Sequence, residues 1–124
     1  MAKKILIIED NEENLNLFNM MLKRNGYDTL EARNGIEGVR IAMTEKPHLI
    51  ITDLQMPFMD GFEVCRNIRS DSSIKDIPII AISAGFSNYP VENLLKFGFN
   101  DFIAKPVNLK KLVYIIERHL GNIV

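Results

Sequence analysis

Residues 49–57 have the sequence Leu49-Ile50-Ile51-Thr52-Asp53-Leu54-Gln55-Met56-Pro57, and they are the clearest indication of the fold. Its apolar run is short, contains β-branched residues and has turn signals at both ends. These features favour a strand that is buried on both faces. The run ends on a carboxylate, Asp53, which therefore stands at the carboxyl end of the strand. Open α/β sheets have their ligand crevice at that end.

A second strand-like run, residues 4–8, ends in the same way on Glu9 and Asp10. Two buried parallel strands that both end in acid can bring three carboxylates to one edge of one sheet. Carboxylates this close repel each other unless a cation neutralises them. Ligand sets made only of oxygen atoms select hard divalent ions such as Mg2+. The sequence therefore predicts a Mg2+ site formed by Glu9, Asp10 and Asp53.

The composition is typical of an ordinary globular domain. The chain has 124 residues, of which 47% are apolar and 25% are charged, and this predicts one domain over residues 1–124. The net charge of −1 argues against bulk electrostatic binding to nucleic acid or to a membrane surface. The apolar run near the N-terminus is too short to span a membrane. The one cysteine, Cys65, excludes an internal disulfide and is typical of the reducing cytoplasm.

Strand-like and helix-like patterns alternate along the whole chain. Strands are expected over residues 4–8, 27–32, 48–52, 77–82 and 100–104. Helices are expected over residues 15–25, 36–44, 62–69, 91–97 and 109–120. Because the connections between them are short, the pattern predicts an α/β domain with a parallel sheet covered by helices on both faces.

The helix expected over residues 15–25 has more apolar residues than one stripe can hold. One stripe at helical spacing contains Leu15, Phe18 and Leu22, which is the pattern of a buried face. Three other residues lie off that stripe: Leu17, Met20 and Met21. They indicate either a wide buried face or an exposed surface on which a partner protein docks.

Two more chemical groups follow predicted strands, Ser83 after the fourth and Lys105 after the fifth. A carboxylate such as Asp53 can attack a phosphoryl group as a nucleophile. Ser83 can then donate a hydrogen bond to a phosphoryl oxygen, and Lys105 can pair with the phosphoryl charge. A cis peptide bond before Pro106 would direct the Lys105 ammonium into the site. Together these strand ends predict phosphoryl chemistry.

In this order, the residues resemble the response-regulator receiver domains of two-component signalling over the whole chain. The family pattern is an acidic pair, a phospho-acceptor followed by Met-Pro and Gly, a serine, an aromatic residue and Lys-Pro. In the same order, this chain has Glu9-Asp10, Asp53, Met56-Pro57, Gly61, Ser83, Phe102 and Lys105-Pro106. The resemblance implies a flavodoxin-like (βα)5 three-layer fold with strand order 2-1-3-4-5. It also implies that Gln55 offers its backbone carbonyl to Mg2+.

The resemblance further implies a phosphorylation switch. Asp53 would take a phosphoryl group from the phosphohistidine of a histidine kinase or a phosphotransfer protein, with Mg2+ present. Ser83 would then move toward the phosphoryl oxygens while Phe102 turns inward. The alternative interpretation of Phe102 is a plain core aromatic. The changed surface would act on a downstream protein effector. Such a domain is expected to be a monomer that catalyses only its own phosphorylation and slow dephosphorylation.

One segment departs from the commoner family pattern. Many relatives carry Ala-x-Ala after the switch residue, whereas this chain has Ala84-Gly85-Phe86. Gly85 leaves the approach to the phosphoryl group open. We therefore expect easier attack by water and a shorter-lived phosphorylated state.

Other classes of protein explain the residues less well. A phosphatase of the haloacid dehalogenase type needs a second Asp where this chain has Gln55, and a flavodoxin needs a Ser/Thr/Gly-rich loop where it has Glu9-Asp10. The chain stops one helix after Lys105-Pro106, which favours a stand-alone regulator without an output domain over a receiver cut from a hybrid histidine kinase. A receiver-like module that binds its partner without phosphorylation also stays open.

Overall fold

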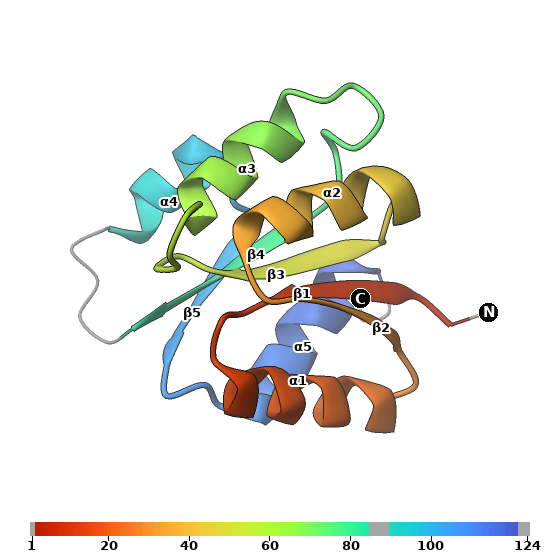
Figure 1. Ribbon diagram of the computed structural model, residues 1–124. Helices are drawn as coiled ribbons and strands as arrows, with labels where there is room; N and C mark the ends of the chain where they lie inside the picture. Colours follow the sequence, from red (N-terminus) through yellow and green to blue (C-terminus); the bar gives the residue numbers. More distant parts are fainter. Residues whose placement is uncertain (1, 85–89, 122–124) are drawn as a thin grey trace.

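The computed structural model describes residues 2–84 and 90–121, which form one sheet with helices on both sides (Figure 1). The strands and helices alternate in the order β1 (Lys4–Ile8), α1 (Glu12–Arg24), β2 (Asp28–Ala32), α2 (Gly35–Glu45), β3 (Leu49–Asp53), α3 (Gly61–Arg69), β4 (Ile79–Ala84), α4 (Val91–Phe97), β5 (Asp101–Lys105) and α5 (Leu109–His119). All strand pairs are parallel, in the order β2-β1-β3-β4-β5. The predicted flavodoxin-like fold is confirmed.

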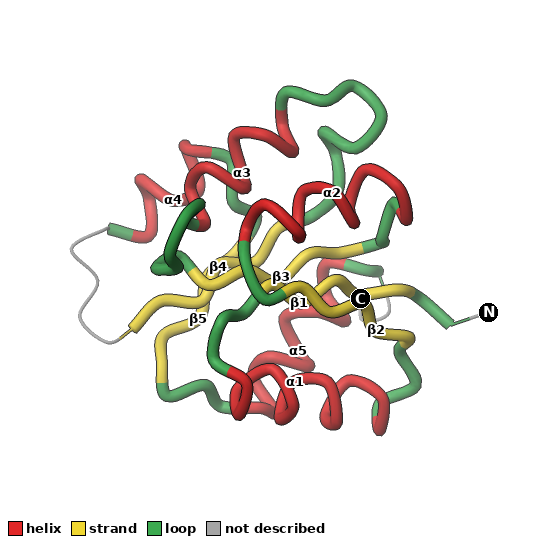
Figure 2. Tube along the Cα trace, viewed as in Figure 1, coloured by secondary structure: helices red, strands yellow, loops and turns green. Residues whose placement is uncertain are grey.

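The sheet separates two apolar cores, because successive side chains of a strand point to opposite faces. In β1, Ile5 and Ile7 pack in the core beneath α1 and α5, whereas Leu6 and Ile8 pack in the core beneath α2, α3 and α4. Figure 2 shows the strands as a middle layer between these two groups of helices. Both faces of the central strands are thus covered, which explains why their sequences are continuously apolar.

Several elements begin or end one to three residues from the predicted positions, for local reasons. Helix α1 starts at Glu12 because Asn11 caps it, its side chain accepting a hydrogen bond from the backbone N–H of Asn14. Strand β4 begins after Pro78, which has no N–H to give to a neighbouring strand. Strand β4 also extends to Ala84. Ser83 is therefore the second-last residue of β4, whereas the sequence predicts that it follows the strand.

Helix α1 has a narrower buried face than its composition allows. Leu15, Phe18 and Leu22 are buried, as the stripe predicts. The prediction of a wide buried face is wrong for two residues, because Leu17 is 40% exposed and Met20 is 48% exposed. Among the described residues, no helix is both long and apolar enough to cross a membrane.

Arg69, the last residue of α3, joins three segments at the amino-terminal ends of β4 and β5. Its guanidinium donates hydrogen bonds to the carbonyl oxygens of Lys75 (2.8 Å) and Ile77 (2.7 Å), twice to that of Gly98 (2.8 and 3.1 Å), and to Oδ1 of Asn100 (2.8 Å). Five hydrogen bonds use every donor that arginine has. The α3–β4 connection and the α4–β5 turn are therefore held by one side chain.

We predict that Arg69→Lys lowers the free energy of unfolding by about 2 kcal/mol or more, because a lysine ammonium cannot reproduce the planar five-donor fork. Urea denaturation measures the change. Arg66→Lys, also on α3, is the matched control: this exposed side chain lies over the ring of Phe97, 5.7 Å from its centroid, where a lysine can also sit. Equal stabilities of the two variants would contradict this role of Arg69.

Candidate functional site

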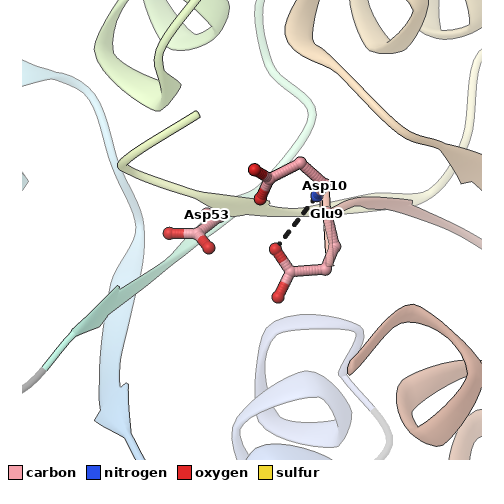
Figure 3. Close-up of side chains that lie close together, drawn as sticks. All are labelled: Glu9, Asp10 and Asp53. Carbon is pink, nitrogen blue, oxygen red and sulfur yellow. Dashed lines mark hydrogen bonds between the residues drawn. The ribbon is translucent and has the colours of Figure 1, made fainter. Parts of the chain in front are cut away.

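The carboxyl ends of β1 and β3 bring three carboxyl groups together, as the sequence predicts. Glu9 and Asp10 follow β1, and Asp53 ends β3. Each residue offers one carboxylate oxygen, and these three atoms lie within 4.8 Å of one another. Figure 3 shows the three side chains at this edge of the sheet. Asp53 is only 5% exposed and Glu9 only 2%, whereas Asp10 is exposed to solvent.

Lys105, the last residue of β5, supplies the positive charge nearest to these acids. Its Nζ lies 2.6 Å from Oδ2 of Asp53 and 3.5 Å from Oε1 of Glu9. Burial by itself lowers the pKa of Lys105, but the hydrogen bond to Asp53 and the two carboxylate charges outweigh it, so the pKa is raised. Lys105 therefore stays protonated beside the acids. The Lys105–Pro106 peptide bond is cis.

Glu9 is the acid whose ionisation the site opposes most clearly. Burial, followed by the hydrogen bond and negative charge of Asp53, raises the pKa of Glu9 to about 7. Lys105 and the side-chain amide of Asn14 act in the opposite direction. The metal-free site therefore holds more negative charge than it can easily accommodate.

These residues are suited to a hard divalent cation. All the side-chain donors are carboxylate oxygens, and they converge on one region at the sheet edge. Oxygen ligands of this kind suit Mg2+, which also keeps several of its own water molecules. The exposed side of the site at Asp10 leaves room for such waters.

The loop after β3 is held tightly against the phospho-acceptor candidate Asp53. The backbone N–H of Gly61 donates to the carbonyl of Leu54 at 3.0 Å. A Cβ on Gly61 would lie 2.4 Å from the backbone oxygen of Asp53, so only glycine allows this approach. Asp60 caps α3 in a capping box with Glu63.

The backbone of Gln55 also takes part in the site. Its N–H donates to Oδ1 of Asp53 at 3.2 Å. The sequence predicts a different contribution from Gln55, a backbone carbonyl ligand for Mg2+, and that role stays a prediction. Each oxygen of the Asp53 carboxylate thus has its own partner, the N–H of Gln55 at Oδ1 and the ammonium of Lys105 at Oδ2.

The two predicted switch residues lie on neighbouring strands. Ser83 of β4 is buried and pairs with Ala104 of β5, while Phe102 of β5 pairs with Ala81. Phe102 is partly buried and packs against the core beneath α2, α3 and α4. This position is compatible with a core aromatic and with a switch residue alike. Gly85, for which we expect an effect on phosphate lifetime, lies outside the described residues.

The side chain of Asn14 also reaches the site, and the sequence did not predict this. Its Nδ2 donates to Oε1 of Glu9 at 3.0 Å. Asn14 also lines a groove of about 190 Å3 between α1 and the segment after β5, together with Leu17, Phe18, Lys105, Pro106 and Val107. The only signal was the position of Asn14 in the first turn of the helix that follows the acidic pair.

The chain matches known proteins over nearly its whole length. The family model of the response regulator receiver domain matches residues 5–117. Among curated proteins, the chain is similar to the polar-differentiation response regulator DivK of Brucella anthropi. The two are 34% identical over 122 residues, which cover 98% of this chain and 99% of DivK.

Two solved structures of related receiver domains have the same fold, and one of them contains a metal ion. The receiver domain of the sensor histidine kinase PA1611 from Pseudomonas aeruginosa is 34% identical, with a TM-score of 0.89 and coverage of 98% of this chain and 99% of that one. That structure holds a magnesium ion in its active-site cleft. The receiver domain of a signal transduction histidine kinase from Syntrophus aciditrophicus is also 34% identical, with a TM-score of 0.88 and coverage of 98% and 92%.

We predict that the metal-free protein becomes less stable as the pH rises from about 5 to about 8. The pKa of Glu9 in the folded state, about 7, lies above its ordinary value of 4.5. In this range the folded chain keeps a proton that the unfolded chain has lost, so rising pH favours unfolding. We expect a loss of about 2 kcal/mol, measured by urea denaturation with a chelator present.

Glu9→Gln should remove most of this pH dependence, because glutamine does not titrate. Glu13→Gln is the matched control, since Glu13 is exposed on the first turn of α1 and should leave the slope as in the wild type. The same slope in Glu9→Gln as in the wild type would show that other groups cause the effect.

Proposed function

Because the chain belongs to the response regulator receiver domain family, we propose that it is the phospho-acceptor of a two-component phosphorelay. One observation carries the proposal: the buried Asp53 carboxylate lies 2.6 Å from the Lys105 ammonium and beside the acidic pair of β1. A nucleophile, a cation to pair with phosphoryl charge and a metal-binding acid pair are the parts that aspartyl phosphorylation needs.

The proposed reaction moves a phosphoryl group from nitrogen to oxygen. A carboxylate oxygen of Asp53 forms the new P–O bond while the P–N bond of the donor phosphohistidine breaks. The electron pair of the broken bond stays on the imidazole nitrogen of the donor. The Lys105 ammonium, which contacts the Asp53 carboxylate before the reaction, then pairs with the charge of the incoming phosphoryl oxygens. Ser83 donates a hydrogen bond to one of those oxygens.

Glu9, Asp10 and Asp53 hold Mg2+ in this proposal, with the backbone carbonyl of Gln55 as a fourth ligand. The ion, when bound, offsets the repulsion between the acids and the phosphoryl group. The support is the all-oxygen donor set and the magnesium in the related PA1611 receiver domain. The donor is a histidine kinase or a phosphotransfer protein, the proteins with which receiver domains work.

We propose that Ser83 and Phe102 transmit the effect of phosphorylation from the site to the surface around β5. Their strands are adjacent, so a movement of Ser83 toward the phosphoryl group opens space beside Phe102. A changed surface around β5 then binds a downstream protein effector. The proposal is of a monomeric cytoplasmic switch that catalyses only its own phosphorylation and dephosphorylation. The net charge of −1 favours a protein partner over nucleic acid.

Two alternatives share the fold with this proposal. The chain resembles receiver domains of histidine kinases as closely as it resembles DivK, so a receiver that works within a hybrid kinase is the first. A receiver-like module that binds its partner without phosphorylation is the second. The complete set of Asp53, Lys105 and the acidic pair favours a phosphorylated protein over this second alternative.

We predict that wild-type protein responds in amide NMR spectra to Mg2+ and then to beryllofluoride, which mimics a phosphoryl group. Shifts should begin around residues 9–10, 53–57 and 102–106 and spread to α4 and α5. Asp53→Asn should lose the beryllofluoride response, because it lacks the carboxylate that binds the mimic. Asp76→Asn, at an exposed loop position, is the matched control and should respond as the wild type does.

A wild-type protein that binds Mg2+ but gives no beryllofluoride shifts would contradict the proposed switch. That result would favour the module that binds without phosphorylation. A beryllofluoride response that persists in Asp53→Asn would instead exclude Asp53 as the phospho-acceptor.

The groove beside α1 is suited to the protein that donates the phosphoryl group. It is continuous with the site, because Lys105 lines the groove and also contacts Asp53. Leu17 lines the same groove, and Met20 adds exposed apolar surface one turn of α1 further on. An amphipathic helix that carries a phosphohistidine can dock in such a groove. Met21, the third predicted partner residue, is only half-exposed and contributes less to this surface.

We predict that Leu17→Glu and Met20→Glu each slow phosphotransfer from the cognate donor about tenfold or more, since a charge replaces apolar contact. Met43→Glu, at an exposed methionine of α2, is the matched control. The variants should keep the wild-type response to beryllofluoride, which needs no docking. Wild-type transfer rates in both α1 variants would show that the donor docks elsewhere.

A further inference from the structure

Asn14 connects the first turn of α1 to the acidic site. Its backbone N–H donates to Oδ1 of Asn11 at 2.9 Å, which caps the helix. Its side chain turns the other way, and Nδ2 donates to Oε1 of Glu9 at 3.0 Å. The helix cap therefore fixes the backbone of Asn14 at the place from which its amide reaches Glu9.

The contact with Asn14 completes the hydrogen bonding of the Glu9 carboxylate. The other oxygen, Oε2, accepts from the backbone N–H of Asp10 at 3.1 Å. Lys105 lies 3.5 Å from Oε1, at the limit of a hydrogen bond. With a donor on each oxygen, the plane of the buried carboxylate is set, and it cannot rotate without losing one of these partners.

The chemical type of residue 14 suits this position. A carboxamide gives a hydrogen bond donor without adding a charge to a cluster that already contains three carboxylates. An apolar residue there would remove the amide donor from Oε1 of the nearly fully buried Glu9, which the Lys105 ammonium approaches only to 3.5 Å. Asn14 donates one hydrogen bond to Glu9, and it is not one of the acidic residues that could bind a metal.

We propose that Asn14 is a positioning residue that orients Glu9 for Mg2+. The inference rests on the proposed function, because it assigns a second layer of support to the same metal site. Groups that hydrogen-bond to metal ligands fix their orientation, and their removal commonly weakens metal binding about 10- to 100-fold. Asn14 acts through Glu9 and does not touch the metal or the phosphoryl group.

The test measures Mg2+ affinity directly, by amide NMR titration without any phosphoryl donor. Asn14→Ala should raise the dissociation constant about tenfold. Asn14→Gln keeps an amide donor and should recover part of the affinity. Asn16→Ala is the matched control, because Asn16 is an exposed asparagine on the same helix and should bind Mg2+ as the wild type does. Thermal denaturation without Mg2+ shows whether each variant is folded.

A double-mutant cycle with Glu9→Gln separates positioning from a general structural effect. If Asn14 acts through Glu9, adding Asn14→Ala to Glu9→Gln changes the Mg2+ dissociation constant by less than about twofold. An equally large change in both backgrounds would overturn the inference, as would wild-type Mg2+ affinity in Asn14→Ala.

These outcomes are distinct from a failure of the proposed function. Mg2+ binding that depends on Asn14, together with no response to beryllofluoride, would support the inference and contradict the phosphorylation switch. A normal beryllofluoride response in Asn14→Ala with unchanged Mg2+ affinity would contradict the inference about Asn14 and support the phosphorylation switch.

Discussion

The crowding of carboxylates at one edge of the sheet is the constraint on which the site depends. Asp53 and Glu9 are almost fully buried, and their oxygens lie within 4.8 Å of each other and of Asp10. Such an arrangement is unfavourable unless positive charge is close. Lys105 supplies it from β5 at 2.6 Å from Asp53. Burial, followed by the hydrogen bond and charge of Asp53, raises the pKa of Glu9 to about 7 although Lys105 is close, so a divalent cation would favour the ionised form of this acid.

The two ends of the sheet serve different purposes. At the carboxyl ends, three carboxyl groups and the Lys105 ammonium converge at the site where we propose phosphorylation. At the amino-terminal ends of β4 and β5, Arg69 uses all five of its donors on neighbouring backbone and side-chain oxygens. A fully satisfied network of this kind is rigid. The rigid end thus lies opposite the carboxyl ends of the strands, where open α/β sheets have their ligand crevice.

The sequence was sufficient for the fold and for the main members of the site. Alternating apolar runs and helical stripes predicted all ten elements, and the resemblance to receiver domains supplied the strand order. Local chemistry moved some of the boundaries, such as the Asn11 cap that starts α1 at Glu12. The sequence left open whether the additional apolar residues of α1 are buried. Leu17 and Met20 are apolar side chains of the kind found in cores, but their exposure depends on where α5 and β5 lie.

The residue types at the strand ends follow from the sequence alone: carboxylates after β1 and at the end of β3, and an ammonium at the end of β5. Parallel pairing brings those ends together, so the site follows from the pattern. The contacts within the site depend on the tertiary structure. The bond from Asn14 to Glu9, the groove beside α1 and the backbone approach at Gly61 all depend on distances of a few ångströms between separate elements. Hydrophobic periodicity specifies which face of an element is buried, but not such distances, because they result from how the side chains of the whole domain pack together.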